Sequence, residues 1–414
     1  MSMPLAIVFN HIGDPQGQES QINLSTLAVV RSLGRRGIKI ILVTTNQRDG
    51  VIGSRYVAGV EFCPYIHEPV ELMHAFFTSL AERYAGAKVL IPSVDECAWY
   101  VGKYYAQLAK NFLIPAPDTQ AINKINNKRF QYEAAQALGI PIPETYFPQD
   151  LTVVETLSRS ISNYPYVIKP NVSFEWKLQS AKSGARGKKG IRVNSAQELL
   201  TVARELFLPG TEFMIQEIIG GRDHRLVTFL GFFSADHQPV SWFIRKKIRQ
   251  CPIDFGYCTM TESCHNPTVL DQSQRLLSAI NYYGVAGVEW KLDPATETYK
   301  LIEINGRPVN TTGCAIAAGV DLPAMAYFYA IGQPLPPVTN WQDGERWAWL
   351  AMDFWAAREL ASTGQGSLWS WIKEALSIKA DAVFARDDLA LSCRYYAKFI
   401  ATLIKLKFKK IIKK

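Results

Sequence analysis

Hydrophobic and polar residues alternate along two runs in the second half of the chain, residues 287–293 and 299–305. Alternation with a period of two is typical of strands whose faces lie in different surroundings. Five residues beginning with Pro294 join the two runs, and a connection of that length is typical of a β-hairpin. The pattern therefore predicts one hairpin over residues 287–305.

The natural register of this hairpin places two glutamates directly opposite each other. It pairs Asp293 with Tyr299 and, four residues further out, Glu289 with Glu303. Opposed like charges destabilise a sheet. The pairing therefore requires either a bound cation or full solvation of both carboxylates.

Alternation along the second strand predicts its two faces. One face carries Leu301, Glu303 and Asn305, and the other carries Ile302 and Ile304. Two carboxylates and a carboxamide, with room for water, suit Mg²⁺ bound jointly with phosphates better than zinc or a closed calcium cage. The charge pattern alone leaves open the alternative of a surface hairpin with two solvated glutamates.

Cations elsewhere in the chain favour the metal site. A short strand over residues 166–169 ends in Lys169, and the loop 171–190 behind it interleaves glycines with lysines and arginine. Such a loop brings backbone amides and positive charge close to a polyphosphate, although a solvated basic surface loop is the alternative. Arg307, just after the hairpin, is a guanidinium fork suited to a carboxylate or phosphate.

The N-terminal part alternates buried strands with helices. Strands are predicted over residues 5–9, 38–43 and 88–91, and helices over residues 24–33 and 70–84. This order is typical of an open parallel sheet over roughly the first 115 residues. No G-x-G-x-x-G motif follows the first strand, so the usual dinucleotide fingerprint is missing.

Two acids open the helix that follows the strand over residues 88–91. The favoured interpretation of Asp95 and Glu96 is that they complement the positive end of the helix dipole.

Composition indicates a globular protein of two to four domains, with 414 residues, 48% hydrophobic and 20% charged. The net charge is +8, and residues 394–414 hold eight basic residues and no acid. The remainder is neutral, so nucleic-acid binding by the whole surface is not expected. Seven scattered cysteines fit a reducing compartment, the N-terminus reads as a strand rather than a signal peptide, and we expect a cytoplasmic protein.

The basic tail has an amphipathic pattern. Over residues 395–414, apolar residues including Phe399 and Ile400 share one face, with Lys398 and Lys405 opposite. Such a helix is a candidate for peripheral contact with an anionic membrane at the inner face. The favoured alternative is a last helix docked on its own protein with a frayed, lysine-rich end.

Five short motifs occur in the order found in the ATP-grasp superfamily. They are Asn127-Lys128 before a helix that ends GIPIP, the VIKP strand, the glycine-rich loop, QEIIGGRD, and VEW with EIN fourteen residues later. Over about residues 5–335 the chain resembles that superfamily. IRKKIRQCPIDFG, EINGRP and AAGVDLP are similar to its branch of predicted carboxylate-amine ligases.

The resemblance implies a nucleotide site. Lys128 and Lys169 would bind ATP phosphates, and the loop 183–190 would close over them with Lys182 and Lys188 as its cations. The adenine-reading hinge and ribose contact would be formed by Gln216, Glu217, Ile219 and Asp223. The superfamily's amide ligases usually have a glutamate where this chain has Asp223.

The resemblance also implies the chemistry around the hairpin. Glu289, Glu303 and Asn305 would be magnesium ligands, in agreement with the pairing argument, and Mn²⁺ is an alternative ion. Arg307 and Arg245 would hold the transferred phosphoryl group or the substrate carboxylate.

The expected fold is α/β and α+β multidomain, with an open parallel-sheet N-terminal domain, a two-part ATP-grasp module and a helical C-terminal extension. The boundaries expected are 1–115, 116–210 for the lid, 211–338 for the larger subdomain, and 339–414.

The expected activity is ADP-forming ligation of a small carboxylate to an amine. A phosphotransferase on the same site and a non-catalytic nucleotide-binding membrane assembly protein are the alternatives. The sequence leaves the oligomeric state open and is compatible with a homodimer.

Overall fold

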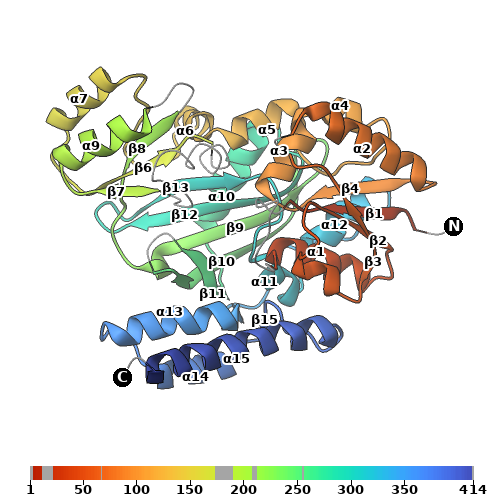
Figure 1. Ribbon diagram of the computed structural model, residues 1–414. Coiled ribbons are helices and arrows are strands. Elements are labelled where there is room, and N and C mark those ends of the chain that lie inside the picture. The colour runs from red at the N-terminus through yellow and green to blue at the C-terminus, as the bar shows by residue number, and fades with distance from the viewer. Residues whose placement is uncertain are drawn as a thin grey trace.

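The computed structural model describes residues 3–11, 22–66, 68–172, 190–207, 212–253 and 256–412, with side chains described up to residue 405. Within these residues the chain forms three sheets with helices around them and a layer of helices at the C-terminal end (Figure 1).

The N-terminal domain is a parallel sheet, as the sequence predicts. Its strand order is β3-β2-β1-β4. The strands are β1 (Leu5–Phe9), β2 (Ile40–Thr44), β3 (Val57–Phe62) and β4 (Lys88–Pro92). The main helices are α1 (Leu24–Gly34), α2 (Val70–Arg83), α3 (Asp95–Lys103) and α4 (Tyr105–Leu108). The edge strand β3 was not predicted.

A second sheet, in the order β5-β8-β6-β7, forms the lid. Its strands are β5 (Thr145–Tyr146), β6 (Tyr166–Pro170), β7 (Ile191–Val193) and β8 (Phe213–Glu217). The helices of this region are α5 (Thr119–Asn126), α6 (Lys128–Ala137), α7 (Leu151–Ser160) and α9 (Ala196–Leu206). Because β8 pairs with β5 and β6, the predicted boundary at residue 211 would divide this sheet. We propose that the boundary follows β8.

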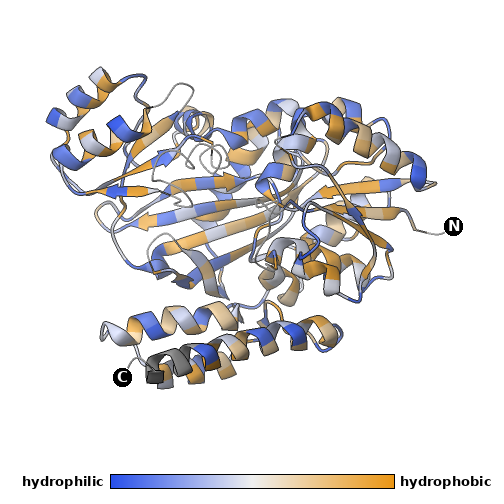
Figure 2. Ribbon diagram, in the orientation of Figure 1, coloured by the Kyte–Doolittle hydropathy of each residue, from blue (hydrophilic) through white to orange (hydrophobic). Residues whose placement is uncertain are grey.

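The third and largest sheet has the order β13-β12-β9-β10-β11-β14-β15. Its strands are β9 (Leu226–Phe233), β10 (Pro239–Cys251), β11 (Tyr257–Ser263), β12 (Gly284–Asp293), β13 (Thr298–Asn305), β14 (Arg346–Ala348) and β15 (Ala380–Asp381). The associated helices are α10 (Pro267–Ala279), α11 (Thr312–Ala317) and α12 (Leu322–Ala330). The central strand β9 is largely hydrophobic and buried (Figure 2).

The predicted hairpin is β12 and β13, and Glu289 pairs with Glu303 as predicted. The register shifts between Glu289 and Trp290, so that Tyr299 pairs with Leu292 and not with Asp293. The extra residue is Ile302, which marks a β-bulge.

The bulge also changes which face one residue occupies. Leu301 pairs with Trp290, and both are fully buried in the same hydrophobic core as Ile304. The prediction that Leu301 shares the face of Glu303 is therefore wrong, because a bulge reverses the alternation on one side of it.

The C-terminal extension consists of more than helices. It contains α13 (Leu350–Ser362), α14 (Leu368–Leu376) and α15 (Leu389–Ile412), but β14 and β15 also extend the large sheet. The expectation of a separate helical extension over residues 339–414 is corrected in this respect. None of the helices in the described ranges is both long enough and apolar enough to span a bilayer.

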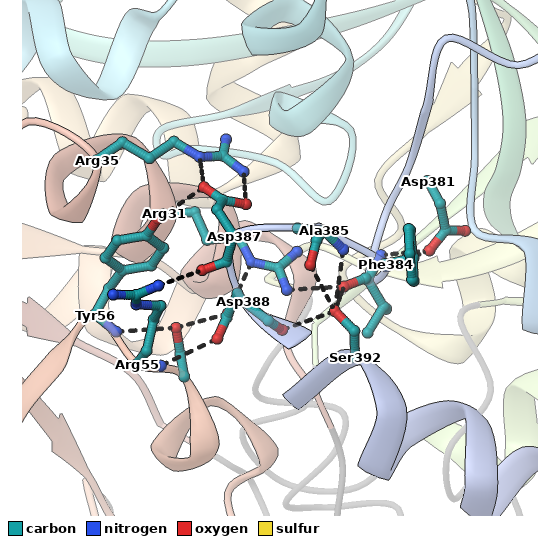
Figure 3. Close-up of polar contacts among 12 residues, drawn as sticks. Arg31, Arg35, Arg55, Tyr56, Asp381, Phe384, Ala385, Asp387, Asp388 and Ser392 are labelled. Carbon is teal, nitrogen blue, oxygen red and sulfur yellow. Dashed lines mark hydrogen bonds and ion pairs between the residues drawn. The ribbon is translucent and has the colours of Figure 1, made fainter. Parts of the chain in front are cut away.

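Two adjacent aspartates join this extension to the N-terminal domain (Figure 3). The fully buried Asp388 accepts from Arg31 Nε at 3.0 Å and from Ser54 Oγ at 2.8 Å. Asp387, which is 40% exposed, accepts from Arg35 Nε at 2.6 Å. The two ends of the chain are thereby held together.

We predict that Asp388→Asn lowers the free energy of unfolding by about 3–5 kcal/mol, because it leaves the buried Arg31 without a counter-charge. Asp387→Asn is the matched control and should cost about 0–1 kcal/mol, since its ion pair is exposed. Urea denaturation measures both. Equal losses for the two variants would contradict this account of the interface.

Candidate active site

One row of residues crosses five strands on a single face of the large sheet. Glu303 pairs with Glu289, Glu289 with Thr228, Thr228 with Arg245, and Arg245 with Ser263. Directly paired residues of antiparallel strands point to the same face. The two glutamates and the arginine predicted from the sequence are therefore on one surface.

Two lysines of the hairpin hold the segment that leaves β8. Lys291 and Lys300 are cross-strand partners. Lys291 Nζ donates to the carbonyl oxygen of Ile219 at 2.7 Å, and Lys300 Nζ contacts Glu217 Oε1 at 2.5 Å and Asp293 Oδ2 at 2.9 Å. The hairpin thus fixes the predicted adenine hinge, and the carboxylate of Glu217 is engaged in this contact.

The side chain of Gln216 supports Lys169. Gln216 Oε1 accepts from Lys169 Nζ at 3.0 Å, and its Nε2 donates to Tyr132 Oη at 2.9 Å and to Thr145 Oγ1 at 3.0 Å. Tyr132 Oη in turn donates to the carbonyl oxygen of Ile302, the bulge residue, at 2.8 Å. Gln216 is 1% exposed, so its side chain fixes the lysine and does not face an open site.

Lys169 faces a mixture of charges. Burial and, to a lesser extent, the neighbouring Lys128 lower the pKa of its ammonium group to about 8, while Glu303 and Glu289 act in the opposite direction. Lys128 is itself 6% exposed, and its backbone N–H donates to the carbonyl of Asn171 at 2.9 Å. The structure therefore places Lys169 within the electrostatic influence of the opposed glutamates, with Lys128 beside it.

Arg307 is joined to the N-terminal domain by a partner that sequence reasoning missed. Its Nε and Nη2 atoms each donate to Asp95 at 2.6 Å, in a bidentate pair, and Nη2 also donates to Asn305 Oδ1 at 3.3 Å. Burial acts to lower the pKa of Arg307, but Asp95 raises it above the ordinary value overall. Asp95 is in the first turn of α3, yet its side chain binds this arginine.

Arg245 is a buried guanidinium, 2% exposed. Its Nη1 donates to Cys258 Sγ and to Thr261 Oγ1, both at 3.3 Å. Among the residues that the structure describes, its Nε has no hydrogen-bond partner. A buried cation with a spare donor favours an anionic ligand beside it.

Of the remaining predicted residues, Asp223 is described by the structure, and Lys182 and Lys188 are not. Asp223 Oδ1 accepts from Gln250 Nε2 at 2.9 Å, and Gln250 Oε1 accepts from Lys247 Nζ at 3.2 Å, which connects the predicted ribose contact to β10. Lys182 and Lys188 lie outside the described residues.

The donor set fits a magnesium nucleotide. Glu289 and Glu303 offer carboxylate oxygens across one strand pair, and Asn305 lies two residues along the same face. Mg²⁺ is usually bound by one or two carboxylates and keeps its other positions for water and phosphate oxygens. Lys169 of β6 and Lys128 at the start of α6 would supply positive charge for the phosphates.

Comparisons with known proteins identify the fold. No family model matches the chain. A D-aspartate ligase from Enterococcus faecium (strain Aus0004) is 23% identical over 285 residues, which cover 66% of this chain and 67% of that protein. The structure of an L-amino acid ligase from Bacillus licheniformis has a TM-score of 0.59 at 13% identity, and covers 81% of this chain and 76% of that one.

Two further structures contain nucleotide. The ADP complex of purK, an N5-carboxyaminoimidazole ribonucleotide synthetase, has a TM-score of 0.61 at 14% identity and covers 83% of this chain and 81% of that one. The biotin carboxylase domain of a Hydrogenobacter thermophilus 2-oxoglutarate carboxylase, bound to MgADP, has a TM-score of 0.60 at 13% identity and covers 84% and 74%.

The chain has the ATP-grasp fold. The resemblance stated from sequence motifs is thereby confirmed. The structures that share this fold include enzymes bound to ADP and to MgADP. The roles of individual residues in this ATP-grasp site stay predictions.

The lowered pKa of Lys169 predicts proton uptake when Mg-ATP binds. Without nucleotide, Lys169 loses its proton as the pH rises through about 8. Phosphate oxygens favour its charged form and raise its pKa, so binding near pH 8 takes up protons, and binding two pH units lower does not.

Isothermal titration in two buffers of different ionisation enthalpy measures this uptake. Lys169→Arg is the control, since a guanidinium keeps its charge over this pH range and should abolish the uptake. Wild-type binding near pH 8 without proton uptake would show that Lys169 does not meet the phosphates.

Proposed function

We propose that this protein is an ADP-forming ligase that joins a small carboxylate to an amine. The observation that carries the proposal is the opposed pair Glu289 and Glu303, whose charges act on Lys169, with Lys128 beside that lysine. The relative named D-aspartate ligase favours amide formation over the phosphotransferase and the non-catalytic alternatives.

The proposed reaction has two steps. A carboxylate oxygen of the substrate attacks the γ-phosphorus of ATP, the bond to ADP breaks, and an acyl phosphate forms. The amine nitrogen then attacks the acyl carbon, phosphate leaves with the electrons of the broken bond, and the nitrogen loses a proton. Positioning and charge neutralisation supply most of the rate enhancement, so no side-chain nucleophile is required.

We assign roles to the residues accordingly. Lys128 and Lys169 neutralise phosphate oxygens, and Gln216 positions Lys169. Arg245 and Arg307 orient the transferred phosphoryl group or the substrate carboxylate, with Arg307 held by Asp95.

The metal and the hinge complete the proposed site. Glu289, Glu303 and Asn305 would hold Mg²⁺, which when bound neutralises charge on the phosphate oxygens. Glu217 and Ile219 present the hinge backbone to adenine, and Asp223 lies where the ribose is expected.

ADP release tests the proposed reaction. We expect release above background only when a carboxylate and an amine are both supplied, with D-aspartate among the first acids and amines screened because of the named relative. A coupled ADP assay over a grid of acids and amines makes the measurement. Full ADP release with one acceptor alone would instead identify a phosphotransferase.

We predict that Glu303→Gln combined with Asn305→Ala lowers turnover at least about a hundredfold and weakens Mg-ATP binding, because both changes remove proposed metal ligands. Glu297→Gln is the matched control, a glutamate of the same hairpin that is 68% exposed at the turn, and should retain activity. Unchanged turnover and affinity in the double variant would refute the metal assignment.

We propose in addition that the end of α15 contacts an anionic membrane. The first half of this helix packs on the protein, since Tyr395 Oη accepts from Trp349 Nε1 at 2.7 Å and Phe399 stacks edge-on against Phe354 at 6.0 Å. Truncation must therefore start beyond these contacts.

Removal of residues 405–414 takes away six lysines and should weaken binding to anionic vesicles while leaving ADP release unchanged. Vesicle sedimentation measures the first and the coupled assay the second. Equal sedimentation of the truncated and full chains would dismiss membrane contact through the tail.

A further inference from the structure

Helix α14 docks on the protein by one side. Trp371 Nε1 donates to the fully buried Asp353 Oδ2 at 2.9 Å, and Glu374 Oε2 forms an ion pair with Arg249 Nη1 at 2.5 Å. Arg249 also donates to Asp353, so these four side chains form one network. The helix is firmly anchored, and its orientation on the protein is fixed.

The other side of α14 is apolar and exposed. Its residues Leu368, Trp369, Ile372 and Leu376 are exposed by 40%, 67%, 41% and 82%. Positions four apart lie above one another on a helix, which places three of them in one row. We call these four residues the α14 face. A contiguous exposed apolar patch of this kind marks a surface that meets another apolar phase.

Helix α15 lies against the same part of the extension. The ring of Phe354 on α13 has its centroid 5.5 Å from that of Trp371 on α14 and 6.0 Å from that of Phe399 on α15. Ile400 and Ile404, four residues apart on α15, are also 53% and 50% exposed. Exposed apolar residues therefore occur on α15 as well as on α14.

The segment from residue 363 to residue 414 is mostly cationic. Residues 363–414 contain eleven basic and four acidic residues. All four acids are engaged with the protein itself: Glu374 with Arg249, Asp381 with backbone N–H groups, Asp387 with Arg35, and Asp388 with Arg31. Exposed basic residues of the segment therefore carry its positive surface charge, among them Lys373, Arg394, Lys398 and Lys405.

We infer that the α14 face docks on an anionic lipid membrane, with Trp369 and Leu376 entering the headgroup region. Exposed tryptophan and leucine beside uncompensated cations form a surface suited to an anionic leaflet. A second copy of this chain fits less well, because it would bring two cationic surfaces together. The α14 face would supply the apolar part of the membrane contact proposed above for the basic tail.

The test uses the full-length chain and vesicles of phosphatidylcholine and phosphatidylglycerol in equal parts. Trp369→Ser with Leu376→Ser should weaken binding about tenfold or more, since most of the inserted apolar area is lost. Phe62→Ser with Leu72→Ser is the matched control, because both residues are apolar and 49% exposed but lie on the N-terminal domain. The control variant should bind the mixed vesicles like the wild type. Neither protein should bind strongly to vesicles of phosphatidylcholine alone.

Three outcomes distinguish membrane docking by the α14 face from membrane contact by the tail alone and from dimerisation. Unchanged vesicle binding of the α14 variant, at an unchanged thermal midpoint, would overturn it. If truncation at residue 405 then still weakened binding, the tail contact would stand without the α14 face. A lipid-free dimer that the α14 variant converts to monomer, seen by sedimentation velocity, would also overturn the inference and assign the face to a second copy.

Discussion

The repulsion between two opposed carboxylates is the constraint on which this site depends. Glu289 and Glu303 are directly paired in the hairpin of β12 and β13, where opposed like charges cost stability. A hairpin selected for stability alone would not retain them. In the proposed site, the two carboxylates would bind the metal, and the nearby cations Lys169 and Lys128 would bind the phosphates of a metal nucleotide.

Around this pair, a few polar contacts hold three parts of the chain in register. Arg307 joins the end of the hairpin to Asp95 of the N-terminal domain, Lys300 joins the hairpin to Glu217 of the lid, and Arg31 joins the N-terminal domain to Asp388 near the C-terminus. Each contact is a charge-assisted bond between segments that are far apart in sequence. Two of these contacts join the lid and the N-terminal domain to the hairpin that carries the proposed metal ligands.

The features predicted correctly from the sequence are those given by the spacing of hydrophobic residues and by the order of the elements along the chain. The parallel N-terminal sheet, the hairpin and the Glu289–Glu303 pair are confirmed because alternation and opposed charge are local signals. The bulge at Ile302 was missed, since nothing in the residue pattern marks one extra residue in a strand. The edge strand β3 was missed because it is only partly buried and carries a weak apolar pattern.

Long-range partners account for most of the other differences. Asp95 resembles any helix-capping acid until the fold brings Arg307 to it, and Lys291 and Lys300 become partners only through the bulge. Gln216 was assigned to the adenine hinge because of its place in a motif, whereas its side chain supports Lys169. A motif gives the position of a residue along the chain, and tertiary packing decides where its side chain points.

The central claim is that the opposed glutamates bind the metal of a metal–ATP complex. Anomalous scattering from Mn²⁺, in crystals grown with a non-hydrolysable ATP analogue, locates that metal directly. The account predicts a peak within about 2.0–2.3 Å of carboxylate oxygens of both Glu289 and Glu303, with the nucleotide phosphates on its other side. Bound nucleotide whose metal lies away from both glutamates would contradict it.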